Sequence, residues 1–244
     1  MLKKLLGLVF LVGLHTGVIA AENLYEKNYK AQNTSNLASL QANPDTKIYV
    51  SNHKDDDNIS MLENGYDMMG TSGFEGFDVA PELALQHAKS IKADTVLIYK
   101  KYGSAKTSAS KIQMIKEAAK KGGGEIDAEN LTEEPTQYKY FASYWAKLPE
   151  PLLGVHVIKL KNAGGAEESS AAEKGLTVLA VVRGSPAAKA GLMRGDMLLK
   201  INDIALGKPE EFSTVVNKFQ GQNVAIQYQR EGESKTTQAT VNRR

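Results

Sequence analysis

A serine between glycines is the first feature of this sequence that suggests catalysis. Ser72 lies between Gly70 and Gly73, and His53 and Asp55 precede it in the chain. A serine hydrolase combines a nucleophile with a base and an acid, and its nucleophile often occupies a Gly-x-Ser-x-Gly turn. Here a glycine follows the serine directly, so the pattern does not match. We interpret the segment as a strand with a glycine bend and predict no catalytic residue.

His53 and three aspartates form the densest group of potential metal ligands. His53 is followed by Asp55, Asp56 and Asp57. This spacing matches neither the calcium-loop pattern nor a two-histidine zinc motif. The glycine run at 122–124 lacks the Lys-Ser/Thr that completes a phosphate-binding loop. We therefore predict a solvated loop at 53–57, no metal site and no cofactor.

The charge balance excludes a strongly basic or acidic partner. The formal net charge is +2, and loss of residues 1–20 would remove Lys3 and Lys4 and leave acidic and basic residues in equal number. A chain near neutrality has no field that attracts nucleic acid or anionic lipid. We interpret the lysines at 116–121 as a solvated helix face and predict no nucleic-acid partner.

The N-terminus has the pattern of a secretory signal peptide. Lys3 and Lys4 precede an apolar run at 5–14, and small residues end at Ala20. Because a membrane-spanning helix needs ~20 apolar residues, this run is short for a span. We predict a cleaved signal at 1–20, no stable membrane insertion after cleavage and a periplasmic or secreted location; the alternative is an uncleaved anchor. The absence of cysteine excludes lipidation at cysteine and disulfides.

Alternating patterns over the first half predict a small α+β domain. Residues 21–46 are polar and are interpreted as a mobile leader with at most one helical turn. Between 47 and 147 the patterns predict strands at 48–50, 66–74, 95–99 and 138–145, a helix from Pro81, and a long loop at 104–134 that holds one amphipathic helix. A sheet with a helix on one face is the expected architecture.

The second half begins after a proline-punctuated linker at 148–151. The patterns predict strands at 153–157, 175–182 and 197–201, a short helix at 187–190, and a hairpin at 224–241. A longer helix begins at Pro209, where Phe212, Val215, Val216 and Phe219 follow the i, i+3, i+4, i+7 spacing.

Residues 184–192, Gly-Ser-Pro-Ala-Ala-Lys-Ala-Gly-Leu, and residues 195–202, Gly-Asp-Met-Leu-Leu-Lys-Ile-Asn, carry a resemblance to a known family. They resemble PDZ domains in the circular arrangement of bacterial HtrA-type proteases. The resemblance covers residues 152–242, and we expect the PDZ domain at 152–244. The resemblance implies a partly open β-barrel with two helices, so that the whole chain is α+β. It also implies that a peptide pairs with an edge strand and places one side chain in an apolar pocket.

The same resemblance implies a set of peptide-binding residues. The carboxylate-binding loop and the strand that follows it are Leu152, Leu153, Gly154, Val155, His156 and Val157, and the opposite wall is Phe212, Val215 and Val216. Glycine at 154 would let the loop expose backbone N–H groups. His156 is either a ligand contact or a solvent-facing strand residue.

The N-terminal part, over residues 47–102, is similar to small α+β domains of bacterial envelope proteins. We therefore expect an exported adaptor that binds the C-terminus or an exposed apolar segment of a partner, such as an envelope protease or a secretion component, without catalysis of its own. One alternative is a hydrolase whose active site lies in the N-terminal domain. Another is a structural protein whose groove is filled by its own chain.

Overall fold

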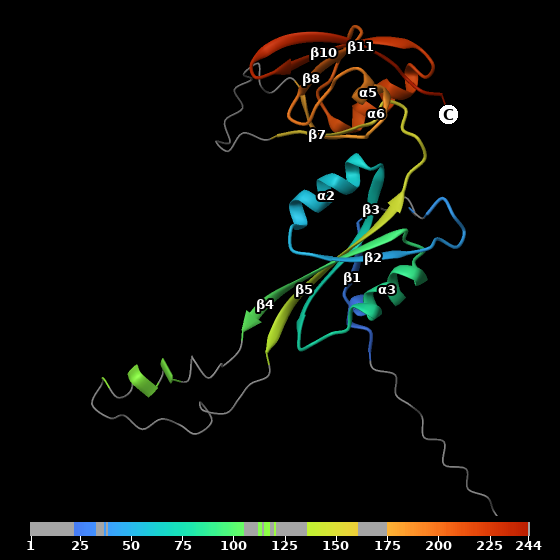
Figure 1. The fold of residues 1–244 in the computed structure, drawn as a ribbon. Coiled ribbons are helices and arrows are strands. Elements are labelled where there is room, and N and C mark those ends of the chain that lie inside the picture. Colours follow the sequence, from blue (N-terminus) through green and yellow to red (C-terminus); the bar gives the residue numbers. More distant parts are fainter. Residues whose placement is uncertain are drawn as a thin grey trace, which may run out of the picture.

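Two β-sheets, each with its own hydrophobic core, make up the protein (Figure 1). The structure is a computed structural model that describes residues 22–32, 37, 39–104, 112–113, 115–117, 120, 136–160 and 175–243. The predicted signal segment at 1–20 and most of the predicted loop at 104–134 lie outside the described residues. None of the described helices is long and apolar enough to cross a membrane. We call residues 22–147 the N-terminal domain and residues 152–243 the C-terminal domain.

The N-terminal sheet has five strands in the order β1-β3-β5-β4-β2. Their bounds are Tyr29–Ala31 for β1, Lys47–Ser51 for β2, Tyr66–Gly76 for β3, Thr95–Ser104 for β4 and Gln137–Lys147 for β5. β2 and β4 are parallel, and the other neighbours are antiparallel. The aromatic stretch that predicted a strand at 138–145 forms the central strand β5, and the strand predicted at 95–99 is paired on both sides.

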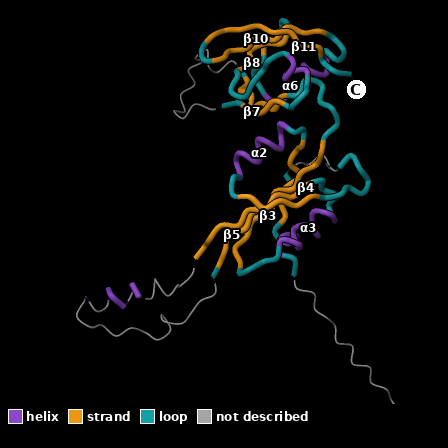
Figure 2. The backbone as a smooth tube through the Cα atoms, in the orientation of Figure 1, coloured by secondary structure: helices purple, strands orange, loops and turns teal. Residues whose placement is uncertain are grey.

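Alternate residues of the central strand supply two different cores. Tyr144 faces the core that α1 (Leu24–Lys27) and α3 (Pro81–Ser90) cover, whereas Trp145 faces the core under α2 (Lys54–Glu63). This alternation follows from the two-residue period of a strand. Figure 2 shows α3 on one side of the sheet and α2 on the other, between the sheet and the C-terminal domain.

Two predictions for this domain were wrong. Residues within the supposed leader belong to the fold, because Tyr25 is fully buried and β1 pairs with β3. The acidic cluster is not a loop: Asp55, Asp56 and Asp57 form the first turn of α2. Carboxylates there face the partial positive charge at the start of the helix, which stabilises it.

The C-terminal sheet runs in the order β11-β10-β8-β7-β6, and the short strand β9 pairs with β8. The strands are β6 (Val155–Ile158), β7 (Leu176–Val181), β8 (Met197–Ile201), β9 (Ile204–Ala205), β10 (Asn223–Arg230) and β11 (Glu233–Thr240), and the helices are α5 (Pro186–Lys189) and α6 (Pro209–Lys218). The sheet and the two helices enclose one apolar core. The α+β fold class is confirmed, and β9 is an element that the sequence patterns did not predict.

Candidate functional site

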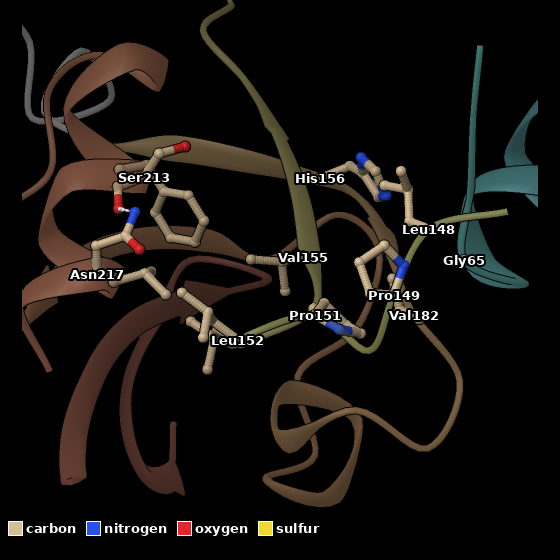
Figure 3. Close-up of a pocket in the computed structure, with 14 residues that line it drawn as sticks. Gly65, Leu148, Pro149, Pro151, Leu152, Val155, His156, Val182, Ser213 and Asn217 are labelled. Carbon is tan, nitrogen blue, oxygen red and sulfur yellow. Dashed lines mark hydrogen bonds between the residues drawn. The ribbon is translucent and has the colours of Figure 1, made fainter. Parts of the chain in front are cut away.

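A groove between an edge strand and a helix is the candidate site of this protein. Among the residues that the structure describes, β6 pairs with β7 alone, and its other edge is available to a further strand. The groove beside it is a cavity of about 200 Å³. Its lining residues are Gly65, Leu148, Pro149, Pro151, Leu152, Leu153, Gly154, Val155, His156, Val182, Phe212, Ser213, Val216 and Asn217 (Figure 3).

The carbonyl groups of the loop Leu152–Gly154 point into the domain. The carbonyl oxygens of Leu152, Leu153 and Gly154 accept hydrogen bonds of 2.9 Å each from the N–H groups of Asn242, Ala187 and Val182, respectively. Within the described part of the chain, the N–H groups of Leu153 and Gly154 donate to no protein atom. Consecutive unpaired N–H groups at one bend form a site for an anion such as a terminal carboxylate.

Gly154 makes this loop geometry possible. Its φ of +86° lies in the left-handed region, which side chains with a Cβ rarely adopt. A Cβ built on Gly154 would also lie only 2.2 Å from Cβ of Ser185. Both the backbone conformation and the close packing therefore require glycine here.

Helix α6 supplies the opposite wall. Pro209 is at its start, where a missing N–H costs nothing, and Glu210 and Glu211 lie in the first turn. Phe212 and Val216, which lie one helical turn apart, line the groove. Val215 does not: it is buried in the core and borders a different hollow beside β9. On this helix the apolar spacing predicted the buried side correctly but did not separate groove from core.

His156 points away from α6. In Figure 3 its imidazole lies beside Leu148, on the opposite side of β6 from Val155. Burial lowers the pKa of His156, and the charge of Asp67 opposes this shift. The ring therefore lies at the boundary with the N-terminal domain and lines the groove, so the role of a ligand contact stays a prediction.

Of the nine residues predicted to bind peptide, seven line the groove. Val157 and Val215 do not line it, because both pack toward the core of the domain. Sequence reasoning missed Ser213 and Asn217 on α6, which the helical spacing from Phe212 and Val216 could have found. It also missed Gly65, Leu148, Pro149, Pro151 and Val182, for which the local sequence holds no signal.

The residues considered for catalysis in the N-terminal domain lie on opposite sides of its sheet. Ser72 is fully buried; its hydroxyl donates to the carbonyl of Tyr25 at 2.6 Å and lies 3.2 Å from the hydroxyl of Tyr144. His53 is exposed at the start of α2, which packs on the other face. The structure therefore does not bring Ser72 and His53 together.

Comparison with known proteins identifies the C-terminal domain. Residues 151–241 match the family model described as "PDZ domain". Over 57 residues, 23% of this chain, the sequence is 40% identical to the zinc metalloprotease RasP of Shouchella clausii (strain KSM-K16), and it spans 14% of that protein.

Two solved structures are similar to parts of the chain. An HtrA-type protease, AlgW, with a decapeptide matches 38% of this chain and 29% of its own chain at 30% identity, with a TM-score of 0.32. The HtrA3 PDZ domain bound to a phage-derived ligand matches 36% of this chain and 81% of its own at 18% identity, with a TM-score of 0.31. This chain therefore spans less than a third of RasP and of AlgW. Residues 151–241 of this chain are a PDZ domain, a peptide-binding module.

Proposed function

We propose that the protein is an exported adaptor that binds the C-terminus or an exposed apolar segment of a partner protein in the groove between β6 and α6. The observation that carries this proposal is that the N–H groups of Leu153 and Gly154, which have no partner among the described residues, and the edge strand β6 border the same cavity. The N–H groups would bind the terminal carboxylate of an extended peptide, and the edge of β6 would pair with its main chain.

The peptide adds to β6 as a further antiparallel strand. Backbone hydrogen bonds to β6 hold its main chain without regard to sequence, and the N–H groups of the loop hold the terminal carboxylate. The terminal side chain enters the part of the cavity that Val155 lines together with the α6 residues Phe212 and Val216. Selection of the ligand therefore depends on the size and polarity of this side chain.

The adaptor has no catalytic activity of its own in this proposal. Ser72, the residue first considered as a nucleophile, is committed to hydrogen bonds inside the N-terminal core. Export is supported by the order of Lys3 and Lys4, the apolar run at 5–14 and the small residues up to Ala20. The partner would be a protein of the cell envelope, such as a protease or a secretion component.

A peptide-binding assay tests the proposal. Fluorescence polarisation with the mature chain compares labelled peptides that end in an apolar residue with a free carboxylate and the same peptides with an amidated end. Hydrogen bonds to a charged group contribute ~1.5–3 kcal/mol, so amidation should weaken binding roughly tenfold or more. Val216→Trp should reduce the affinity for large terminal residues before small ones. Equal binding of free and amidated peptides would contradict carboxylate recognition and leave internal apolar segments as the ligands.

A panel of hydrolase substrates, assayed with the same protein, tests the absence of catalysis. Substrate turnover that persists after contaminating enzymes are removed would favour the alternative of a hydrolase whose active site lies in the N-terminal domain. A groove filled by the protein's own chain would instead exclude every added peptide, free or amidated.

A further inference from the structure

The peptide groove has a second wall, on the side of β6 that faces away from α6. Five residues of the cavity lie on the side of β6 that faces away from α6: Gly65, Leu148, Pro149, His156 and Val182. We call these five residues the interdomain wall. Gly65 belongs to the N-terminal domain, and Leu148 and Pro149 belong to the linker. The cavity therefore extends beyond the PDZ domain, and its lining includes both domains.

Direct hydrogen bonds hold the interdomain wall in place. The N–H of Arg183 donates to the carbonyl of Glu63 at 2.8 Å, and the N–H of Leu148 donates to the carbonyl of Gly65 at 2.9 Å. The guanidinium of Arg183 donates to Oδ1 of Asn64 at 3.1 Å. The first two bonds satisfy backbone carbonyls at and just after the C-terminal end of α2, and the third places a cation there, where positive charge is favoured.

The chemistry of the interdomain wall is apolar. Leu148, Pro149 and Val182 present hydrocarbon. A Cβ built on Gly65 would lie 3.5 Å from Cγ1 of Val182 and 3.4 Å from Nζ of Lys147, which donates to the carbonyl of Asn64. The remaining member is His156, whose half-buried ring favours the uncharged form. A charged side chain placed here would lose water and meet no opposite charge among these five residues, with the uncharged His156 as its one polar neighbour in the wall.

The strand period decides which ligand residue meets this wall. Side chains directly opposite each other on paired strands lie on the same face, and successive residues alternate between faces. In Figure 3, Val155 lies on the α6 side of β6 and His156 on the other side. If the terminal side chain of a peptide enters the space beside Val155, the penultimate side chain lies on the His156 side.

We propose that the interdomain wall selects the penultimate residue of a bound C-terminal peptide and favours an uncharged, apolar side chain there. This inference rests on the proposed function, because it needs a peptide paired with β6. It makes the N-terminal domain part of the binding site. The ligand is thus a protein C-terminus whose last two residues are both apolar. The last side chain contacts the α6 side of the groove, and the penultimate side chain contacts the interdomain wall.

The test uses the mature chain and peptides that differ only in the penultimate residue: leucine, alanine, glutamate or lysine. We expect leucine to bind roughly tenfold more tightly than either charged residue, since small changes of apolar contact in a pocket are worth about this factor. Leu148→Gln should weaken the leucine peptide and leave the alanine peptide unchanged.

Charge substitution at the exposed Pro149 gives the sharper readout. Pro149→Lys should shift preference toward the glutamate peptide and Pro149→Glu toward the lysine peptide, each by about two- to fivefold, as expected for a partly exposed ion pair. The matched controls are Ser234→Lys and Ser234→Glu, which make the same charge changes on the exposed start of β11, at the far edge of the sheet. The control pair should shift neither preference.

The outcomes separate this inference from the proposed function. If free peptides bind more tightly than amidated ones but the penultimate residue and the Pro149 charge have no effect, carboxylate recognition stands and the interdomain wall has no selective role. If no peptide binds, both proposals are wrong. If peptides bind but amidation has no effect, selection of the penultimate residue of a C-terminus is wrong, whereas binding of internal apolar segments in the groove stands. Equal shifts in the Pro149 and Ser234 variants would assign the effect to net charge and overturn selection by the wall.

Discussion

Gly154 and Ser185 touch: a Cβ on Gly154 would lie 2.2 Å from Cβ of Ser185 and 2.5 Å from its Oγ. Ser185 cannot move away easily, because its hydroxyl caps α5 by accepting from the N–H of Ala188 at 3.2 Å. The loop Leu152–Gly154 and the start of α5 are therefore packed as one unit. A change in the loop acts on the stability of the domain as well as on its ligands.

Gly154→Ala should destabilise the PDZ domain by roughly 2–5 kcal/mol, as the sum of a left-handed backbone penalty and an overpacking penalty. Gly184→Ala is the matched control, because Gly184 also has a positive φ, +72°, but nothing lies within 4 Å of its added Cβ. It should cost only about 1–2 kcal/mol. Urea unfolding of the two variants measures the difference, and equal losses would show that the contact with Ser185 is relieved without cost.

The ion pair of Asp196 with Arg230 is the second site where a substitution should cost stability. The Asp196 carboxylate is 1% exposed; it accepts from Nε and Nη2 of Arg230 at 2.6 and 2.8 Å and from the N–H of Met193 at 2.8 Å. Asp196→Asn should cost about 2–3 kcal/mol, since these are hydrogen bonds to a charged group. Arg230→Met should cost more, because it leaves the buried carboxylate unpaired. The reverse order in chemical denaturation would mean that the carboxylate is better solvated than its burial indicates.

The stability of the N-terminal domain should fall in mild acid because of His87. Its ring is buried against Tyr29 and Tyr144, and its Nε2 has no hydrogen-bond partner among the described residues. Burial lowers the pKa of His87 from 6.5, although the charge of Glu26 opposes the shift. Unfolding restores the ordinary pKa, so below it the unfolded chain binds a proton that the folded chain does not. The stability contribution is therefore complete above the ordinary pKa and declines as pH falls toward the folded pKa.

His87→Leu tests this pH dependence, since leucine keeps an apolar side chain in place but does not titrate. Trp145, the sole tryptophan, is buried in the same domain and reports its unfolding by fluorescence. Unfolding free energies between about pH 7.5 and pH 5.5 should fall less steeply in the variant than in the natural protein. Burial also lowers the pKa of His156, so a residual slope is expected. Identical slopes would assign the acid sensitivity to other groups.

Ser72→Ala should weaken the N-terminal fold and leave peptide binding unchanged. The substitution leaves the buried carbonyl of Tyr25 without its 2.6 Å hydrogen bond. An unsatisfied buried acceptor costs ~1–3 kcal/mol. Thermal unfolding followed by Trp145 measures the loss, and polarisation with a C-terminal peptide measures binding. A loss of peptide affinity in a protein that remains folded would connect Ser72 to function by a route other than stability.

The elements of the PDZ domain could be predicted from sequence because their signals are local. The spacing of Phe212, Val215 and Val216 predicts a helix, since 3.6 residues make one turn wherever the helix lies in the fold. The turn residues at 184–186 and 195–196 likewise mark where strands and helices end. These patterns, with the family resemblance, predicted the loop at 152–154, the strand after it and the helix opposite.

The burial of Tyr25, the direction of His156 and the membership of Gly65, Leu148 and Pro149 in the groove were decided only by the tertiary structure. Tyr25 lies in a polar segment and is buried because β1 joins the sheet beside β3, a contact across some forty residues of chain. The position of His156 in β6 decides on which face of the strand its side chain lies. What that face meets is set by how α2 and the linker dock on the PDZ domain. Such contacts join residues that are distant in the chain, so neither periodicity nor local propensity encodes them.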